Sequence, residues 1–571
     1  MLLMCCNYVL LRLQLCYYCT IRQVSNTDDN AVECESETLF SNTYNFGNFN
    51  WCDKTINALA QHLVSADILP QKEYFIPYKN QHLDLHNLYG FMSVAATREA
   101  LQKVVDDNTR RLIHSGASSA GLGTVGASQI LSVSQWLGDF EEWVNQNSPN
   151  QTEQNYAKEL FKRLDYLVIK ALDNSIYGIN LFGFETCVRE QIYGSDLYPE
   201  IVDQFCSRVS QLSSFMPLYQ ISTSLVNETT AAHNAKMLEL SIDMIGERYN
   251  YLPTIYNNLY KSAALNRGGK DEYQLDSHLS YLFEGFPELA YEIFRYDLNN
   301  QFMLGQGVMV VVPNKYFYES EKQVITAYFP PGIWSYYWTH DEDGNELDDD
   351  DLIIVSKYGG LIQIRAETDR LPIFVNIQNY QQYDPQNPTR RTAAQIYHGD
   401  YWNSGESKLT SISKNVEEAR AENYRIWLNG PKFTNDDPYS DLTFSTDQIY
   451  FDDGISKDNF EAGNSILQTF RIVIQKTNET SGLLYLETEN LQYNSESRVD
   501  KIIPTIGVID VYGFEGNVVA GSVATLVECD DCGMEIGYEW PIETDRSQFT
   551  LNEMSMKLNK KFRIEVGLKF N

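Results

Sequence analysis

The sequence predicts an α/β region followed by an all-β region: a partial (β/α)8 barrel of the TIM type and then two β-sandwich domains. Between residue 86 and about residue 290, short apolar strands alternate with helices whose apolar residues recur every three to four positions. That alternation is typical of parallel βα units. Beyond about residue 290 the apolar period falls to two, and Pro and Gly separate the segments, which is typical of antiparallel sheets.

The elements of the barrel region follow from this spacing. Helices are expected at 93–105, 154–173, 198–213 and 231–265, and strands at 111–115, at 176–183 and in the run that approaches Trp136. A Gly- and Ser-rich loop, 115–128, follows the first strand. The expected domains are an irregular N-terminal segment (1–80), the partial barrel (81–290), a proximal β-sandwich (291–378) and a distal β-sandwich (379–571).

The β region contains predicted strands at 307–313, 323–330 and 352–355, divided by turns and by the acidic loop Asp341–Asp351. The four consecutive Asp residues at 348–351 could suggest a Ca²⁺ site. The spacing of an EF-hand is missing, however, so a solvated loop is favoured.

The composition limits the classes of partner. The chain has 571 residues, a formal net charge of −33 and 43% hydrophobic residues. So much negative charge argues against nucleic acid or an anionic membrane surface as a partner, since both would repel it. A soluble acidic surface explains the charge most simply, and the 38 Tyr and 8 Trp residues offer rings that could stack on sugars.

The ten Cys residues are too sparse for a disulfide scaffold in a chain of this length. Pairs at 187/206 and 529/532 are plausible in an oxidising compartment. Cys529 and Cys532 stand without a second pair or a nearby His, so zinc is not expected there. We expect no metal and no other cofactor.

The N-terminal twenty residues are apolar but interrupted by Arg12, and they lack a basic leading region. They resemble a poor signal peptide or an arbitrary start more than a membrane span. The sequons at Asn150, Asn227 and Asn478 permit glycosylation, although such triplets also arise by chance.

The stretch SQWLGDF, residues 134–140, is the first candidate for chemistry. A carboxylate such as Asp139, just after a Gly at a strand end, can project into a cleft at the C-terminal rim of a barrel. Trp136 could exclude water there and raise the pKa of the acid. The alternative is an ordinary turn, which by itself is more common, because Asp and Gly both favour turn geometry.

Several segments resemble glycoside hydrolase family 31, the α-glucosidase family. The segment HNLYG at 86–90 is similar to that family's HNLYG, and WLGD at 136–139 to its WLGDN. The segment SIYGINLFGFETC at 175–187 is similar to SLFGI followed by GADIC. Further similar segments, in the family's order, lie at 206–217 (CVRWMQLGAFYP in the family), 248–253 (RYTLLP), 301–305 (QFLLG), 328–330 (YFP) and 451–454 (WDDG).

The resemblance implies a barrel with its active site at the C-terminal strand ends, and hydrolysis of O-glycosyl bonds in an oligosaccharide or glucoside. Family enzymes retain the anomeric configuration, with one Asp as nucleophile, a second as acid/base, and about 5–5.5 Å between the carboxyl groups. Asp139 falls on the acid/base position. Trp136, Glu185 (in place of the Asp of GADIC) and Ser222 (in place of a sugar-contacting His) fall on the substrate site.

The resemblance also implies a disulfide between Cys187 and Cys206, because these two residues fall on a family disulfide pair. A disulfide at this place favours a secretory route, and so an extracellular, lysosomal or cell-surface protein.

The sequence also departs from the family pattern. The family's nucleophile lies in a WIDMNE strand upstream of HNLYG, and no such segment precedes residue 86. Asp243, in SIDMIGE, is rejected as the nucleophile because it lies directly before the RYNYLP segment, in a predicted helix. Ser115 lies where the family has a substrate-gripping Arg, and Gln135 replaces the usual His before Trp136.

The first strands of the barrel and an N-terminal β-domain have no counterpart before residue 86. Parallel edges left open are costly. We therefore expect that residues 1–85 cap the barrel, that another chain completes it, or that the chain is a truncated product; truncation or degeneration is favoured.

Two hypotheses for function follow. The first is a retaining hydrolase of O-glycosyl bonds with Asp139 as the acid/base, for which the nucleophile segment is missing. The second is a catalytically inactive carbohydrate-binding or interaction protein. The second is favoured, because the Arg and His of the family's substrate site are replaced as well as the nucleophile.

Overall fold

The computed structural model describes the greater part of the chain from residue 82 onward. The described residues are 82–105, 109–116, 121–147, 152–221, 231–265, 276–277, 299–305, 307–318, 323–330, 332–337, 353–356, 359–379, 395–398, 423–430, 442–457, 459, 462–492, 503–514, 516–518, 521–530, 533–545 and 548–570. The chain divides into two compact units, Met1–Ala96 and Thr97–Asn571. The described part of the first unit belongs to helix α4 (His82–Gln102), which continues into the second.

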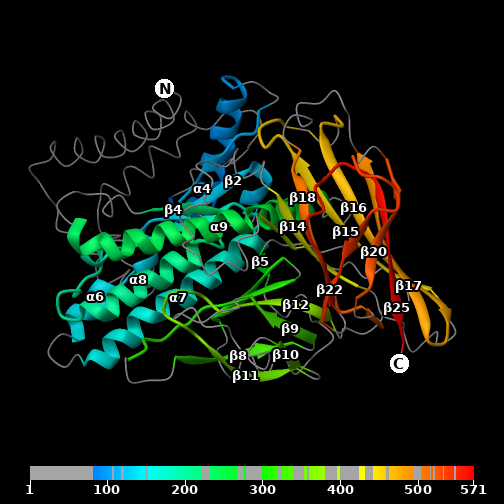
Figure 1. Cartoon of the computed structure of the whole chain (residues 1–571). Helices are drawn as coiled ribbons and strands as arrows, with labels where there is room; N and C mark the ends of the chain where they lie inside the picture. The colour runs from blue at the N-terminus through cyan, green and yellow to red at the C-terminus, as the bar shows by residue number, and fades with distance from the viewer. Residues whose placement is uncertain are drawn as a thin grey trace, which may run out of the picture. The chain divides into compact units, whose positions relative to one another are not determined.

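A four-stranded parallel sheet forms the core of the α/β region (Figure 1). Its strands run in the order β1 (Ile113–His114), β2 (Ala127–Leu131), β3 (Phe182–Glu185) and β4 (Leu218–Gln220), and each pairs in parallel with its neighbour. Gly183 allows β3 to approach β4 closely, because a Cβ at this position would lie 2.0 Å from the carbonyl oxygen of Leu218. The parallel βα arrangement agrees with the sequence prediction, but the described strands do not close into a barrel.

Helices connect and cover these strands. They are η1 (Leu122–Val125), α5 (Val133–Leu137), α6 (Phe140–Asn147), α7 (Glu153–Ile176), η3 (Arg189–Gln191), α8 (Pro199–Ser213) and α9 (Ala231–Leu265). The predicted helices at 198–213 and 231–265 agree with α8 and α9. The strand predicted at 176–183 is wrong in its first half, because α7 continues to Ile176 and β3 begins only at Phe182. Among the described helices, none is long and apolar enough to span a membrane.

The segment between β2 and Asp139 also differs from the prediction. Strand β2 ends at Leu131, and helix α5 then carries Trp136. The helix begins at Ser132, whose backbone N–H donates to the side-chain oxygen of Gln135 at 2.8 Å. Gly138 ends the helix with φ 59°, a left-handed conformation that favours glycine. Asp139 therefore follows a helix, and the expectation that it directly follows a strand is wrong.

A mainly antiparallel six-stranded sheet follows in the chain. Its order is β10 (Ile353–Ser356), β9 (Gly332–Tyr336), β12 (Ile373–Asn379), β7 (Val308–Val311), β6 (Gln301–Leu304) and β5 (Asp276–Ser277). Side chains alternate between its two faces. Phe302 and Val310 join the hydrophobic core of the helical region, whereas Met303 and Met309 join a second core. The second core also contains residues of the ribbon formed by β8 (Val324–Phe329) and β11 (Gly360–Arg365).

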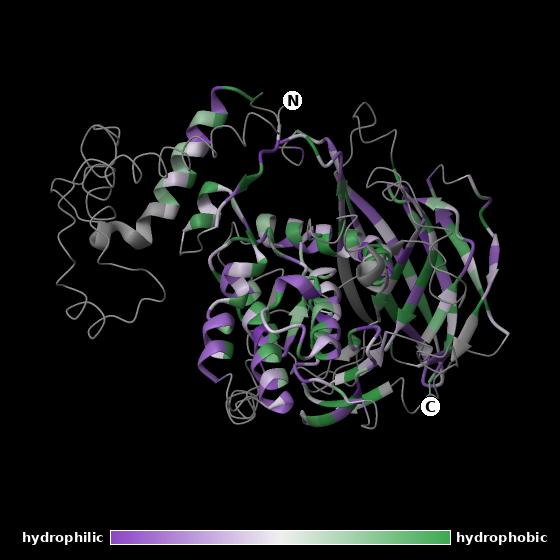
Figure 2. Cartoon of the chain, turned by 90° about the vertical axis from the view of Figure 1, so that its left-hand side faces the viewer, coloured by the Kyte–Doolittle hydropathy of each residue, from purple (hydrophilic) through white to green (hydrophobic). Residues whose placement is uncertain are grey.

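Two further sheets form the C-terminal region and share a third core. One contains β13 (Gln395–His398), β14 (Tyr424–Asn429), β18 (Thr505–Tyr512), β22 (Glu543–Asp545), β23 (Gln548–Leu551) and β24 (Met556–Lys557). The other contains β15 (Leu442–Asp452), β16 (Ser465–Asn478), β17 (Ser481–Gln492), β19 (Asn517–Val518), β20 (Val523–Cys529), β21 (Glu539–Pro541) and β25 (Phe562–Lys569). Hydrophobic and hydrophilic residues alternate along many of these strands (Figure 2), as a sheet with one buried face requires.

Candidate functional site

The carboxyl ends of the parallel strands are where a barrel of this kind carries its chemistry. Glu185 is the last residue of β3 and is partly buried. Its side-chain Oε2 accepts a hydrogen bond from the backbone N–H of Val133 at 3.4 Å, and its backbone oxygen accepts one from Nε1 of Trp136 at 3.1 Å. The structure thus brings together Trp136 and Glu185, which the sequence analysis assigned to one site.

A small polar group lies beside Glu185 at the end of β2. The hydroxyl of Ser132 is 3.2 Å from the side-chain oxygen of Gln135 and 3.1 Å from the hydroxyl of Ser134. A Cβ at Gly116, which follows β1, would lie 3.4 Å from the side-chain nitrogen of Gln135. Sequence reasoning noted Gln135 only as a replacement for His and missed Ser132; the serine's place as the residue before a helix was the available signal.

Asp139 lies at the surface, just before helix α6. Its side chain is 71% exposed, and its Oδ1 accepts a hydrogen bond from Nη2 of Arg163 on α7 at 2.8 Å. Arg163 also lies 3.5 Å from Glu159 on the same helix. The contacts of Asp139 therefore go to the helical layer, whereas those of Glu185 go to the strand end.

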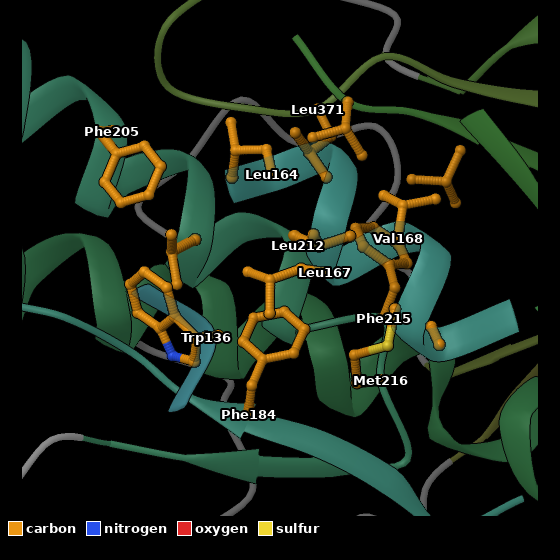
Figure 3. Close-up of a cluster of buried hydrophobic side chains, with 14 of the residues drawn as sticks. Trp136, Leu164, Leu167, Val168, Phe184, Phe205, Leu212, Phe215, Met216 and Leu371 are labelled. Carbon is orange, nitrogen blue, oxygen red and sulfur yellow. The ribbon is translucent and has the colours of Figure 1, made fainter. Parts of the chain in front are cut away.

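Trp136 is part of the hydrophobic core. Only 1% of the residue is exposed. Its ring centroid lies 5.9 Å from that of Phe205 on α8, and Figure 3 shows the ring among side chains such as Phe184 and Leu167. A role in stacking on a sugar would require this ring to be uncovered first.

The predicted disulfide between Cys187 and Cys206 is confirmed, with Cα atoms 5.3 Å apart and both residues buried. It joins the segment after β3 to helix α8. Cys529 is disulfide-bonded as well, whereas Cys532 lies outside the described residues. Ser222, the third predicted substrate-site residue, also lies outside the described residues, so its role stays a prediction.

Most polar residues of the family-like segments have structural contacts instead. Arg208 on α8 is fully buried and donates to the backbone oxygens of Ala366 at 3.0 Å and Arg370 at 2.7 Å. Burial lowers the pKa of Arg208 to about 10. Gln211, one turn further along α8, donates to the backbone oxygen of Thr368 at 2.9 Å. Together they fasten α8 to the segment between β11 and β12.

Arg248 has the same kind of role between α9 and the end of α8. Its guanidinium donates to the backbone oxygens of Ser214 at 3.1 Å and Pro217 at 2.5 Å, and also to that of Met216. Burial lowers the pKa of Arg248 to about 10. Three carbonyl groups of the segment that follows α8 are thereby satisfied.

Asp452, at the end of β15, is a carboxylate with many contacts to distant parts of the chain. Its side chain is fully buried. It accepts hydrogen bonds from the hydroxyls of Tyr256 at 2.5 Å and Tyr450 at 2.8 Å, from the backbone N–H of Gly454 at 2.8 Å, and from the guanidinium of Arg110. We call these four side chains, Arg110, Tyr256, Tyr450 and Asp452, the Asp452 cluster.

The Asp452 cluster joins three distant segments: the residues before β1, helix α9 and strand β15. Arg110 also donates to the hydroxyl of Tyr256 at 2.5 Å, and its backbone N–H donates to the carbonyl of Ile455 at 2.9 Å. Burial acts to lower the pKa of Arg110, but the charges of Tyr256 and Asp452 outweigh it and raise that pKa above its ordinary value. Burial, followed by the nearby Asp452, raises the pKa of Tyr256.

The neighbouring Asp453 shapes the turn after β15. Its carboxylate accepts from the backbone N–H groups of Ile455 at 2.9 Å and Ser456 at 2.8 Å, and from the side-chain amide of Asn459 at 2.7 Å. Burial acts to raise the pKa of Asp453, but these bonds and that of the Ser456 hydroxyl outweigh it and hold the pKa well below its ordinary value.

The geometry at the strand ends supplies one carboxylate, Glu185, with hydroxyl and amide groups near it. Within the described ranges, no group of three or more His, Cys, Asp or Glu residues is arranged to hold a metal ion. Asp139 accepts its hydrogen bond from Arg163, whereas Glu185 accepts one from the backbone of Val133. The arrangement can orient polar groups of a ligand, and among the residues that the structure describes, Asp139 and Glu185 share no hydrogen-bond partner that would hold them together as the close pair of a retaining enzyme.

Comparison with known proteins finds similarity to the same family over part of the chain. The sequence pattern of the glycosyl hydrolases family 31 TIM-barrel domain matches residues 24–258. Intestinal sucrase-isomaltase of Suncus murinus is 26% identical over 265 residues, 46% of this chain and 12% of its own length. A probable alpha-glucosidase of Oryza sativa subsp. japonica is 25% identical over 307 residues, 52% of this chain and 28% of its own.

A solved structure agrees at the level of the fold. The glucosidase II alpha subunit superimposes with a TM-score of 0.53 at 14% identity, covering 85% of this chain and 43% of that chain. Both folds have parallel βα units followed by mainly antiparallel sheets. Residues 24–258, less than half of the chain, are similar to the TIM-barrel domain of glycoside hydrolase family 31. The chain spans less than a third of the length of the two relatives above.

Proposed function

We propose that this protein is a non-catalytic member of the α-glucosidase type of family 31, which binds a carbohydrate or another partner and does not hydrolyse it. The observation that carries the proposal is the position of Asp139. The acid/base candidate is 71% exposed and paired with Arg163 on the helical layer. A general acid has to reach the glycosidic oxygen of a substrate held at the strand ends.

The contacts of Glu185 support the same proposal. Glu185 ends a strand, but its carboxylate accepts a hydrogen bond from the backbone of Val133, at the beginning of α5. The motif WIDMNE, in which the family's nucleophile lies, does not occur in the sequence before residue 86, although the family's TIM-barrel pattern matches from residue 24. Double displacement needs a nucleophile as well as an acid, and loss of either lowers the rate by several powers of ten.

The second candidate function is hydrolysis of O-glycosyl bonds by the retaining mechanism, as part of carbohydrate metabolism. The similarity to a sucrase-isomaltase and a probable alpha-glucosidase favours it. For this reaction, Asp139 would have to leave Arg163 and turn toward the strand ends. The nucleophile would have to come from residues outside the described ranges or from another chain.

The proposed ligand is an oligosaccharide or glucoside, and the proposed location is the secretory pathway. The Cys187–Cys206 disulfide supports the location, because structural disulfides persist in oxidising compartments. The net charge of −33 supports a neutral ligand over nucleic acid.

Release of glucose by the purified full chain decides between the two functions. Maltose and a nitrophenyl α-glucoside are the substrates, and Asp139→Asn and Glu185→Gln are compared with the control Glu141→Gln, an exposed carboxylate on α6. We expect no turnover above background from any of the four proteins. Turnover by the parent chain overturns the proposal, and its loss in Asp139→Asn alone would assign that residue as the acid/base.

Binding is measured separately on a glycan array with the full chain. We expect Glu185→Gln to weaken the binding of α-glucosides, whereas Glu190→Gln, an exposed change on η3, leaves it unchanged. If the parent chain binds no glycan, the carbohydrate part of the proposal is wrong and a macromolecular partner remains.

A further inference from the structure

A candidate site for glycosylation lies in the hairpin between β16 and β17, about three hundred residues after Glu185 in the chain. Strand β16 ends at Asn478 and strand β17 begins at Ser481, so a loop of two residues joins them. Asn478, Glu479 and Thr480 form an Asn-X-Thr sequon, and all three residues are exposed. The proposed function uses none of them.

Thr480 contacts the side-chain amide of Asn478 through two groups. The backbone N–H of Thr480 donates to Oδ1 of Asn478 at 2.9 Å, and its hydroxyl oxygen lies 3.1 Å from the same Oδ1. Both bonds that the Asn478 side chain makes with described residues therefore end on Oδ1. The amide nitrogen Nδ2 is left for an incoming group, with the Thr hydroxyl beside the amide.

The hairpin holds this arrangement from both sides. Asn478 pairs with Ser481 across the ladder, and the hydroxyl of Thr477 donates to the carbonyl of Ser481 at 3.0 Å. The backbone N–H of Phe570, just after β25, donates to the carbonyl of Thr480 at 3.0 Å. The turn is thus fixed through its backbone, while its side chains remain exposed to a bulky group.

We propose that Asn478 is the acceptor of an N-linked glycan. The donor is an oligosaccharide carried on a lipid diphosphate. The Asn478 Nδ2 forms a bond with the anomeric carbon, the bond from that carbon to the diphosphate oxygen breaks, and the lipid diphosphate leaves with the electron pair. One proton of the amide passes to a base of the transferase. No oxidant or reductant takes part in this transfer.

A second, independent observation, the Cys187–Cys206 disulfide, supports the compartment in which this transfer occurs. The buried disulfide Cys187–Cys206 belongs to an oxidising compartment, and N-glycosylation of exposed sequons is a modification of secreted proteins. The sequons at Asn150 and Asn227 lie outside the described residues, so only Asn478 is argued from geometry.

The test is site-resolved mass spectrometry of the full chain, secreted from eukaryotic cells behind a cleavable leader. Trypsin cleavage after Lys476 and Arg498 releases the peptide 477–498, which contains no other sequon. Removal of the glycan by an amidase in heavy-oxygen water converts a modified Asn to labelled Asp. We expect label at residue 478 in most of this peptide.

Four variants separate the sequon from the turn. Asn478→Gln and Thr480→Val remove the acceptor or the hydroxyl and should abolish the label. Thr480→Ser keeps the hydroxyl and should retain it. Thr477→Ala removes a hydrogen bond of the same turn outside the sequon and should retain the label too.

An unlabelled peptide 477–498 from the secreted parent chain overturns the proposal, whether or not Asn150 or Asn227 carries a glycan. Label that persists in Thr480→Val overturns the role of the hydroxyl. Neither result depends on whether the chain hydrolyses glucosides, so this proposal and the proposed function fail independently.

Discussion

Asp139 and Asp452 are carboxylates in opposite surroundings. Asp139 is 71% exposed and pairs with Arg163 on α7, which also lies close to Glu159. In the Asp452 cluster, Asp452 is fully buried and bonded to Arg110 and two Tyr hydroxyls. Both lie in segments that resemble the family. The difference indicates that residues in the family-like segments of this chain contribute to the packing of its segments, and that Asp139 is not held in place for a reaction.

The same contrast extends to Arg208 and Arg248. Arg208 is buried and Arg248 is half-buried, and each donates to backbone carbonyls of a different segment. A buried charge without partners is very costly, so these contacts leave little freedom for substitution. An exposed ion pair contributes little to stability, so a substitution at Asp139 should cost little. Four predictions test this comparison.

The largest effect is expected for Asp452→Ala. Removing this carboxylate leaves the hydroxyls of Tyr256 and Tyr450 without their acceptor and the charge of Arg110 without its partner. Because the Arg110 side chain is 37% exposed, water can solvate its charge, and the cost comes mainly from the two Tyr hydroxyls, about 1–3 kcal/mol each in the free energy of unfolding. Urea denaturation, with Asp139→Asn as the control, measures it. Equal losses in the two variants would contradict the contrast between the regions.

The next largest effect is expected for the double variant Cys187→Ala/Cys206→Ala. The disulfide closes a loop with a sequence separation of 19 residues. In the chain-entropy description, its removal lowers the free energy of unfolding by about 3 kcal/mol. Thermal denaturation without reductant compares the variant with the parent. If reductant lowers the melting temperature of the variant as much as that of the parent, the stabilisation that reductant removes does not come from the Cys187–Cys206 disulfide.

A smaller effect, dependent on pH, is expected for Asp453. Its pKa is lower in the folded than in the unfolded chain, so its contribution to stability is present above the unfolded pKa, near 4. The contribution falls as pH drops from about 4 toward the folded pKa. The difference in the free energy of unfolding between the parent and Asp453→Asn should therefore shrink from pH 5 to pH 2.5. A constant difference would show that the carboxylate charge is not involved.

The smallest effect is expected for Asp139→Asn. It removes one exposed ion pair, which contributes about 0–1 kcal/mol. The melting temperature should move by no more than a few degrees, and the spectrum of the folded chain should not change. A loss comparable to that of Asp452→Ala would mean that Asp139 has a buried role that its surface contact with Arg163 does not reveal.

Much of the helical region follows from local signals. The 3.6-residue period predicted α8 and α9 nearly to the residue, because a helix satisfies its backbone within itself. The segment around Trp136 was harder, since five residues of helix give no period to detect. There, the hydrogen bond from the backbone N–H of Ser132 to the side-chain oxygen of Gln135 stabilises the beginning of α5, and this helix separates Asp139 from the strand end.

The candidate site was predicted only in part. Trp136 and Glu185 are in contact, through Nε1 of the indole and a backbone oxygen, while their role in binding a substrate stays a prediction. The burial of that ring against Phe205 depends on the packing of α8, which lies about seventy residues further along the chain. Ser222 and the sequence before residue 82 lie outside the described residues.

The sequence alone determined the parallel-then-antiparallel order of the chain, its long helices, its acidic charge, and, through the resemblance, the pair Cys187 and Cys206. Each of these depends on composition or on residues near one another in the chain. Only the tertiary structure decided that Asp139 faces Arg163 and that Arg110, Tyr256 and Asp452 meet. The burial of a carboxylate is fixed by segments hundreds of residues apart, and no local pattern records which of them come together.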